Sequence, residues 1–204
     1  ANLCCAAAAG VALGLPADLI AEGVGAVERV PGRLEAIDHP GGARILVDYA
    51  HTGDALEKAL EAMRDLRPRR LVALFGCGGD RDRSKRPKMG EVAGRLADLT
   101  VVTSDNPRSE DPQAIINDIL PGVEATGAVR HDRAAFPPAG QRGYLVEPDR
   151  RRAIELAVSL LQEGDLLLVA GKGHEDYQII GDRRIHFDDR EEVRRAMAMT
   201  GEHR

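Results

Sequence analysis

The stretch Leu99-Thr100-Val101-Val102-Thr103-Ser104-Asp105-Asn106-Pro107-Arg108 joins an apolar run to a polar loop, and a helical pattern begins just beyond it at Pro112. A strand, a loop and a helix in that order form the repeating unit of a doubly wound α/β sheet. In such sheets ligands bind at the carboxyl ends of the strands, where loops and helix N-termini converge. This stretch therefore predicts a fold class and also the edge of the sheet that carries the site.

The same unit recurs on both sides of this stretch. Further strands are expected at the apolar runs Ile45 to Val47, Leu71 to Phe75, Tyr144 to Val146 and Leu166 to Ala170. The last of these runs has no polar position, as is typical of a parallel strand buried on both faces. Helices are expected between the strands, because residues such as Leu56, Leu60 and Met63 recur at helical spacing. We expect an α/β, Rossmann-like, mostly parallel sheet with helices on both faces.

The remaining segments give shorter elements. Hairpins are expected from Leu34 to Val47 and from Tyr177 to Phe187, because each holds two apolar runs around a glycine turn. Two short helices are expected at the start, the second with Pro16 at its first helical position. Asp111 and Pro112 are expected to begin the helix after the opening stretch. Gly122 to Gly143 loses periodicity, so we expect a long connection there with at most one short helix.

Composition excludes several classes of protein. The 204 residues are 43% hydrophobic and 30% charged, with a net charge of -5 and only 3% aromatic residues, so a nucleic-acid-binding face is not expected. The three cysteines are an odd number with no zinc spacing, which favours a reducing, cytoplasmic location. No membrane span is expected. The chain opens inside an apolar run without a methionine, so we expect a fragment of a larger polypeptide.

Four polar, glycine-rich loops follow the expected strands. Right-handed crossovers between parallel strands place such loops at one edge of the sheet, so we expect them to form one site. The four loops are Asp48 to Thr52, Gly76 to Arg86, Ser104 to Arg108 and Gly171 to Glu175.

The residue types of the third loop suit a zwitterion. Arg108 can pair with a carboxylate, while Asp105 and Asn106 can accept hydrogen bonds from an ammonium group. The alternative, that the loop is an Asx-turn with a surface arginine, stays open on these residues alone.

The glycines of two other loops match no nucleotide-binding pattern. Gly76 to Gly79 lacks the spacing of a dinucleotide loop, and Gly171-Lys172-Gly173 lacks the Walker pattern. His51, His174 and Glu175 match no zinc motif, so a polar cluster is the preferred reading over a metal site. Three basic residues of the second loop, Arg81, Lys85 and Arg86, either belong to this site or form a solvated basic loop on the surface, and both readings stay open.

Six motifs in a fixed order resemble the Mur ligase family. They are Val30-Pro31-Gly32-Arg33-Leu34-Glu35, Val47-Asp48-Tyr49-Ala50-His51-Thr52, Phe75-Gly76-Cys77-Gly78-Gly79-Asp80-Arg81-Asp82, Lys85-Arg86-Pro87, Asp105-Asn106-Pro107-Arg108 and Ala170-Gly171-Lys172-Gly173-His174-Glu175. The resemblance is closest to the members that add meso-diaminopimelate to UDP-N-acetylmuramoyl-L-alanyl-D-glutamate in peptidoglycan synthesis. The sequence departs from the family pattern at Gly53 and Ser84, where proline and glycine are usual.

The resemblance implies a three-domain, ATP-dependent ligase. It assigns residues 1–29 to the helical end of the central ATP-binding domain and residues 30–204 to the C-terminal domain, which brings the incoming amino acid. The N-terminal domain, the P-loop and the Mg²⁺ ligands have no counterpart in this chain, so the chain alone is expected to be inactive. The small-molecule partners implied are ATP, meso-diaminopimelate and the UDP-MurNAc-dipeptide.

The resemblance also implies site residues. Positions that match the meso-diaminopimelate site are Arg81, Asp105, Asn106, Pro107, Arg108, Gly171 and Glu175. Positions that match this domain's share of the ATP site are Asn2, Arg33, Asp48 and His51. Two alternatives remain open: a folylpolyglutamate synthase-like ligase, against which the Asp105 to Arg108 and Gly171 to Glu175 motifs argue, and a non-catalytic α/β module that binds a small molecule.

Overall fold

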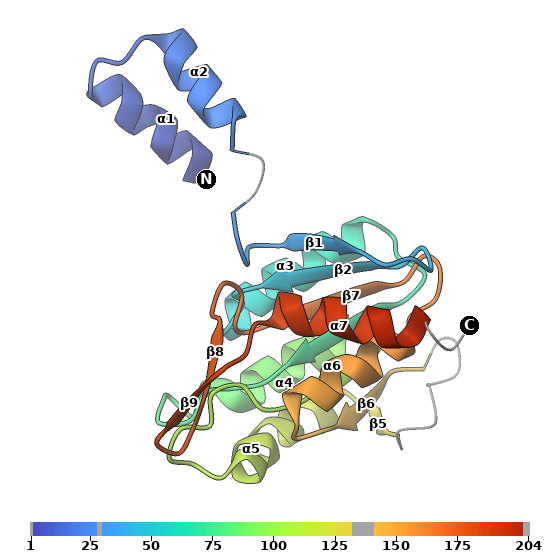
Figure 1. Cartoon of the computed structure of the whole chain (residues 1–204). Coiled ribbons are helices and arrows are strands. Elements are labelled where there is room, and N and C mark those ends of the chain that lie inside the picture. The colour runs from blue at the N-terminus through green and yellow to red at the C-terminus, as the bar shows by residue number, and fades with distance from the viewer. Residues whose placement is uncertain (1, 28–29, 132–140, 202–204) are drawn as a thin grey trace. The chain divides into compact units, whose positions relative to one another are not determined.

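The computed structural model describes residues 2–27, 30–131 and 141–201, and it divides into two compact units, Ala1–Pro31 and Gly32–Arg204. Figure 1 shows the elements of both units. The division between Pro31 and Gly32 lies two residues from the domain boundary expected from the sequence. The assignment of the first unit to a central ATP-binding domain stays a prediction.

The first unit is a pair of helices, α1 (Asn2–Ala12) and α2 (Ala17–Gly25). The expectation that Pro16 occupies the first helical position of α2 was wrong. Its ψ of 144° is extended, so Pro16 is the N-cap and the helix begins one residue later. Apolar side chains are exposed on this unit, with Leu13 78% and Val11 69% accessible.

The second unit is built on a seven-stranded sheet in the order β1-β2-β7-β3-β4-β6-β5. Only the β1–β2 pair is antiparallel, and every other neighbouring pair is parallel, which confirms the expected mostly parallel sheet. The strands are β1 (Glu35–Asp38), β2 (Arg44–Asp48), β3 (Leu71–Phe75), β4 (Leu99–Val102), β5 (Val129–Arg130), β6 (Gly143–Val146) and β7 (Leu166–Ala170).

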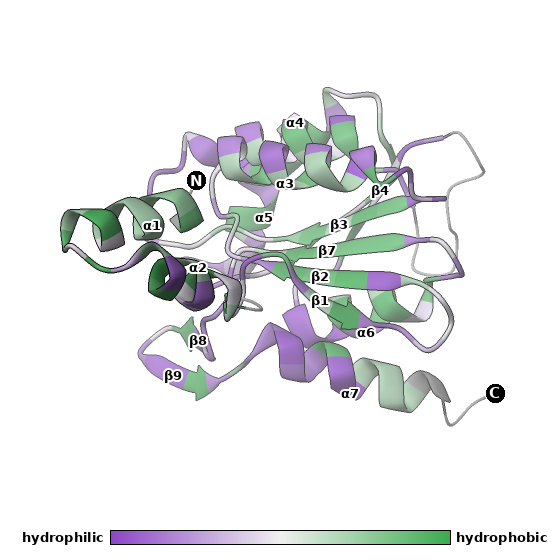
Figure 2. Cartoon of the chain, turned by 90° about the horizontal axis from the view of Figure 1, so that it is seen from above, coloured by the Kyte–Doolittle hydropathy of each residue, from purple (hydrophilic) through white to green (hydrophobic). Residues whose placement is uncertain are grey.

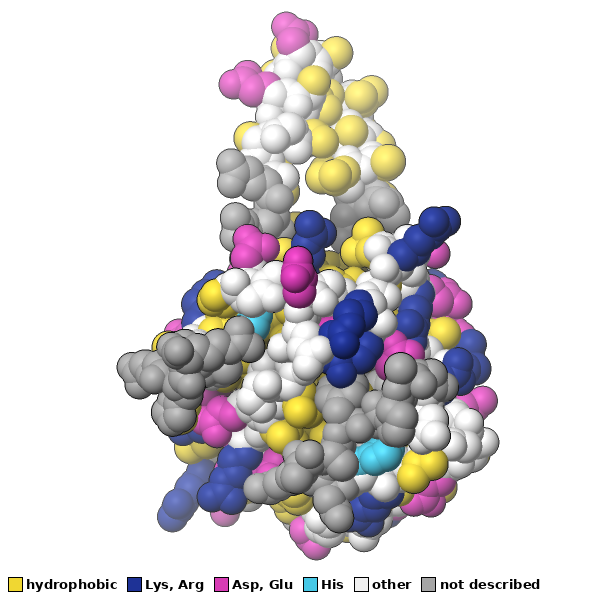
Figure 3. Space-filling model, turned by 90° about the vertical axis from the view of Figure 1, so that its right-hand side faces the viewer, with side chains coloured by type: hydrophobic (Ala, Val, Ile, Leu, Met, Phe, Trp, Pro, Cys, Tyr) yellow, Lys and Arg dark blue, Asp and Glu magenta, His cyan; other side chains and the backbone are white. Residues whose placement is uncertain are grey.

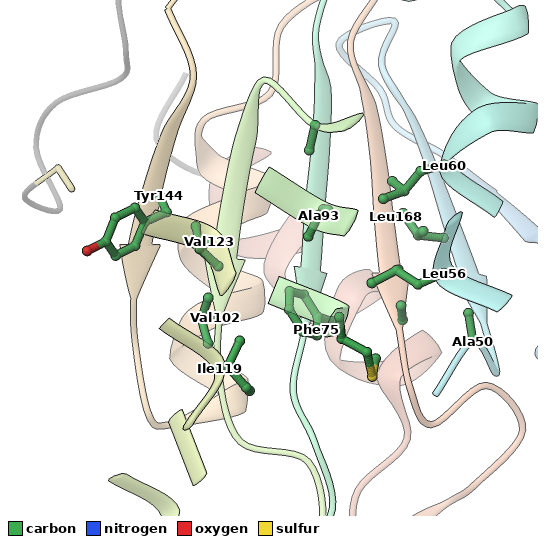
Figure 4. Packing of buried hydrophobic residues seen from close by; sticks show 14 of the residues in the cluster. Ala50, Leu56, Leu60, Phe75, Ala93, Val102, Ile119, Val123, Tyr144 and Leu168 are labelled. Carbon is green, nitrogen blue, oxygen red and sulfur yellow. The ribbon is translucent and has the colours of Figure 1, made fainter. Parts of the chain in front are cut away.

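Helices cover both faces of this sheet. The helices are α3 (Gly53–Asp65), α4 (Lys85–Leu96), α5 (Pro112–Glu124), α6 (Arg150–Ser159) and α7 (Asp189–Gly201). In Figure 2 the apolar strands lie between α3 and α4 on one side and α6 and α7 on the other. Two buried clusters result. One joins α3, α4 and α5 to the sheet, and Figure 4 shows Leu56, Phe75, Ile119 and Leu168 within it. The other joins α6 and α7 to the opposite face.

Helix α5 extends further than the sequence pattern indicated. Asp111 and Pro112 begin it as expected, since the Asp111 carboxylate accepts a hydrogen bond from the Gln113 backbone N–H. The expected loss of structure at Gly122 was wrong, because the helix runs to Glu124. A Cβ at Gly122 would lie 1.8 Å from the Pro87 carbonyl oxygen, so this glycine allows α5 to approach α4 closely. Strand β5 was not expected. The short helix expected within this connection was given no position, and residues 132–140 of the connection lie outside the described residues.

A separate two-stranded sheet, β8 (Tyr177–Ile180) and β9 (Arg183–His186), confirms the closing hairpin. On the face shown in Figure 3, lysine and arginine side chains are interspersed with aspartate and glutamate, without a field of one sign. In the part of the chain that the structure describes, no helix has the length and apolar character needed to cross a membrane.

Candidate active site

The four polar loops meet at the carboxyl edge of the sheet, as their positions after parallel strands predict. The Gly171 N–H donates to the Asp48 carbonyl at 3.1 Å, and the Gly79 N–H donates to the Asn106 carbonyl at 2.9 Å. A Cβ at Gly79 would lie 1.9 Å from the Pro107 carbonyl oxygen. Glycine is therefore required at position 79 for two of the loops to pack together.

Arg108 is held in an uncommon backbone conformation. Its φ is 54°, in the left-handed region, where residues with a Cβ are rare and strained. The hairpin holds it there, because the Arg108 N–H donates to the Ile179 carbonyl at 3.1 Å and the Gly181 N–H donates to the Arg108 carbonyl at 2.7 Å. The Nη1 atom donates to the Gly79 carbonyl at 2.8 Å. Among the described residues no partner accepts from its Nη2 or Nε, so the half-buried guanidinium keeps donors for a ligand.

Lys172 is fully buried and lies among the polar side chains Asp105, Asn106 and Glu175. Its Nζ donates to the Asn106 side-chain oxygen at 3.1 Å and to the Tyr177 carbonyl at 2.6 Å. The same atom lies 3.4 Å from Asp105 Oδ1 and 3.6 Å from Glu175 Oε2. Burial lowers the pKa of Lys172, and the nearby Asp105 opposes that effect. Lys172 was not predicted as a site residue.

Asp105, Asn106 and Glu175 are brought together as expected, but the amide has a different role. The Asn106 Oδ1 accepts from Lys172 and from the Ile179 backbone N–H, and its Nδ2 donates to Glu175 Oε2 at 3.0 Å. The ammonium that Asn106 contacts is therefore that of Lys172. Asp105 is 8% exposed, and its Oδ1 has no hydrogen bond of good geometry within the described residues. The two carboxylates are the acceptors that remain for a ligand.

Gly171 begins the fourth loop and lies beside Asp105 of the third. Its φ is 117°, which residues with a side chain rarely adopt, and a Cβ placed on it would face the Asp105 carboxylate at 3.9 Å. Glycine at this position keeps the space beside Asp105 clear.

Arg150 holds the starts of the third and fourth loops together. This fully buried residue forms two hydrogen bonds to the Asp189 carboxylate, at 2.8 and 2.7 Å. It also donates to the Ser104 carbonyl at 3.2 Å and to the Ala170 carbonyl at 3.0 Å. Because Ser104 follows β4 and Ala170 ends β7, one guanidinium ties together the strand ends from which the two site loops start. Sequence reasoning missed Arg150, which stands in a run of three arginines typical of a surface.

Arg86 supports the second loop. It is fully buried and pairs with Glu110 at 2.7 Å and with Asp118 at 2.8 Å, and it donates to the Gly78 carbonyl. Hydrogen bonding to Arg86 lowers the pKa of Glu110 to about 2. The solvated-loop alternative is thus wrong for Arg86. Arg81 is exposed and donates to the adjacent Asp80 carbonyl, so among described residues its guanidinium is otherwise uncommitted.

The predicted ATP-site residues of this unit gather around Tyr49. The Arg33 guanidinium lies 4.9 Å from the centre of the Tyr49 ring, and the His51 ring lies 4.6 Å from it. The Asp48 carboxylate accepts from the Leu34 N–H at 2.8 Å. Burial raises the pKa of Tyr49, and Glu175 adds to the rise. Tyr49 stood within a quoted motif but was given no role.

Asn2 belongs to the first unit, so its placement beside these residues stays a prediction. Within the described residues, no group of three or more histidine, cysteine, aspartate or glutamate side chains is arranged to hold a metal ion.

A cavity of about 360 Å³ lies between the third loop and the β8–β9 hairpin. Its lining includes Ser104, Pro107, Gln178, Ile180 and Phe187. Gln178 donates to the Asp105 carbonyl at 2.7 Å, so this wall also holds the loop that carries the site.

Comparison with known proteins identifies the family. Residues 32–173 match the family described as Mur ligase, glutamate ligase domain. The chain belongs to the Mur ligase family. The match covers the sheet from β1 to β7 and all four loops of the site up to Gly173.

Relatives with known names agree with this membership. The chain is 53% identical over 193 residues to the UDP-N-acetylmuramoyl-L-alanyl-D-glutamate--2,6-diaminopimelate ligase of Geobacter metallireducens, covering 94% of this chain and 38% of the relative. It is 49% identical over 199 residues to the ligase of the same name from Thermosynechococcus vestitus, covering 97% and 37%. The chain therefore spans less than two fifths of the length of these curated relatives.

Solved structures show the same fold. A structure of a UDP-N-acetylmuramoyl-L-alanyl-D-glutamate--2,6-diaminopimelate ligase matches with a TM-score of 0.70 and 37% identity over 100% of this chain and 38% of that one. A Mycobacterium tuberculosis folylpolyglutamate synthase complexed with ADP matches with a TM-score of 0.55 at 22% identity, covering 77% of this chain and 33% of that one. At that identity the likeness concerns the fold alone.

Proposed function

We propose that this chain is the amino-acid-binding part of a ligase that adds meso-diaminopimelate to UDP-N-acetylmuramoyl-L-alanyl-D-glutamate. The observation that supports this most is the convergence of two site loops at one sheet edge, the third loop with Asp105 and Arg108 and the fourth loop with Glu175. A guanidinium with uncommitted donors on the same loop as one carboxylate, with a second carboxylate on the neighbouring loop, offers the charges that one zwitterionic end of an amino acid requires.

Meso-diaminopimelate suits this arrangement because it carries two such ends. One end is held by the loops, with its carboxylate on Arg108 and its ammonium on Asp105 and Glu175. The other end then presents its amine for reaction. When lysine presents its α-amine for reaction, its other end carries an ammonium but no carboxylate and would leave the half-buried Arg108 without a partner, so the site is expected to reject it. The exposed Arg81, the turn residue Pro107 and Gly171 complete the proposed substrate site.

In the proposed reaction ATP converts the carboxylate of the nucleotide-linked substrate to an acyl phosphate. The amine of meso-diaminopimelate attacks the acyl carbon through a tetrahedral intermediate, and phosphate leaves as the amide forms. The task of the second unit is to position the amine, which supplies catalytic advantage through orientation. The Asn106 amide donates a hydrogen bond to the Glu175 carboxylate and so orients it to bind the ammonium of the end that the loops hold.

Arg33, Asp48 and His51, with Asn2, are proposed to form this chain's share of an ATP site. An exposed arginine can neutralise phosphate charge, and a carboxylate can accept from ribose hydroxyls. Asp48 already accepts from the Leu34 backbone, which fixes the loop that carries Arg33. The P-loop and Mg²⁺ ligands are assigned to a central domain of which residues 1–29 are the helical end, and the reaction is placed in the cytoplasm. The isolated chain is expected to form no product.

The alternative is that the chain is part of a folylpolyglutamate synthase, since such an enzyme has the same fold. The test is an assay of ADP formation by the polypeptide encoded by the complete reading frame. We expect turnover to require both the UDP-MurNAc-dipeptide and meso-diaminopimelate, and upstream sequence to encode a P-loop. Turnover supported by a folate and glutamate, or independent of meso-diaminopimelate, would refute the proposal. The 204-residue chain assayed alone is the matched inactive control.

A further inference from the structure

Lys172 has features that packing alone does not require. A fully buried ammonium is costly unless it is paired, and its pKa is lowered by that burial. An ammonium has three donors. Two of them serve Asn106 and the Tyr177 carbonyl, while the two proposed ligand carboxylates lie 3.4 and 3.6 Å away. The Lys172 ammonium is thus a positive charge of the protein itself beside Asp105 and Glu175, the two carboxylates that are proposed to bind the ammonium of the ligand.

The charges around Lys172 can be counted. The largest charge effects on Lys172 come from three carboxylates, Asp105, Glu175 and Asp189, and from one guanidinium, Arg150. With Lys172 included there are three negative and two positive charges, a net charge of -1. One ligand ammonium makes this cluster neutral, and the carboxylate at the same end of the ligand balances Arg108.

Removal of Lys172 changes that balance. The cluster would carry a charge of -2, so a single ligand ammonium would no longer neutralise it. The surplus negative charge would repel the distal carboxylate of meso-diaminopimelate, whereas lysine has no carboxylate there to be repelled. Loss of Lys172 is therefore expected to weaken meso-diaminopimelate binding more than lysine binding.

We propose that Lys172 is a positioning and specificity-determining residue that sets the charge of the site so that it accepts a zwitterion in preference to a lone ammonium. This role rests on the function proposed above. It acts through Asp105, Glu175 and Asn106, and Lys172 does not touch the ligand.

The test is calorimetric titration of the 204-residue chain with meso-diaminopimelate and with L-lysine. The variants are Lys172→Met, Lys172→Gln and Lys172→Arg, with the exposed Lys58→Met as the matched control. We expect the ratio of the two affinities to fall by about tenfold or more in the two neutral variants. The arginine variant, which keeps the charge, and the control are expected to retain the wild-type ratio.

The ratio separates charge from structure. A merely structural lysine would weaken both ligands equally, and an unchanged ratio in Lys172→Met would overturn the inference. If the methionine variant does not fold, Lys172→Gln is judged by the same criterion, because its amide keeps donors for the neighbouring acceptors. A wild-type chain that binds neither ligand would instead refute the proposed function, so the two failures are distinguishable.

Discussion

The buried Arg150–Asp189 pair gives a stability prediction whose size follows from its contacts. Both side chains are fully buried, and the guanidinium makes two hydrogen bonds to the carboxylate and one each to the Ser104 and Ala170 carbonyls. Arg150→Met leaves a buried, unpaired carboxylate and two carbonyls without their donor. Breaking a buried ion pair in this way costs about 3–5 kcal/mol.

The assay is urea unfolding at neutral pH followed by circular dichroism. We expect Arg150→Met to lower the free energy of unfolding by about 3–5 kcal/mol, and the exposed Arg152→Met on the same helix to lower it by less than about 0.5 kcal/mol. Adding Asp189→Asn to Arg150→Met should recover part of the loss, because the unpaired charge is then gone. A loss below about 1 kcal/mol in Arg150→Met would refute the reasoning, since it would mean that the carboxylate is not desolvated.

Three further outcomes are expected. Gly79→Ala should destabilise the fold and abolish ligand binding, measured by thermal melting and calorimetry, because its Cβ would lie 1.9 Å from the Pro107 carbonyl oxygen. Since the pKa of Glu110 is lowered to about 2 from an ordinary 4.5, its stabilisation is complete above pH 4.5 and lost toward pH 2; acid unfolding should be less steep in that range in Arg86→Met. Burial raises the pKa of Cys77 to about 12, so Ellman's reagent should modify two of the three thiols natively and all three in urea.

The strands and the common edge of their loops were predictable because their signals are local. An uninterrupted apolar run such as Leu166–Ala170 indicates burial on both faces, and a glycine-rich loop directly after it indicates a strand end. The cap of α5 was predictable for the same reason, since Asp111 and Pro112 stand next to each other at its start.

The buried cations were not predictable, because their partners lie far away in the chain. Arg150 pairs with a carboxylate 39 residues on, and Lys172 contacts an amide 66 residues before it. In the sequence alone Arg150 stands in a run of three arginines typical of a surface, and Lys172 stands in a glycine-rich motif that gave it no role of its own. The course of α5 past Gly122 was missed because a glycine that breaks a helix and one that lets two helices approach have the same local signal.

The central claim is that the second, third and fourth loops form a site for one zwitterionic end of meso-diaminopimelate, with Arg108 on its carboxylate. The most direct test is a calorimetric competition between meso-diaminopimelate and L-lysine for the wild-type chain, repeated with Arg108→Lys. We predict that the wild type prefers meso-diaminopimelate by about a hundredfold or more and that the variant loses the preference, because an ammonium cannot reproduce the two-pronged contact of a guanidinium. Equal affinity of the wild type for both ligands, or an unchanged preference in Arg108→Lys, would contradict the claim.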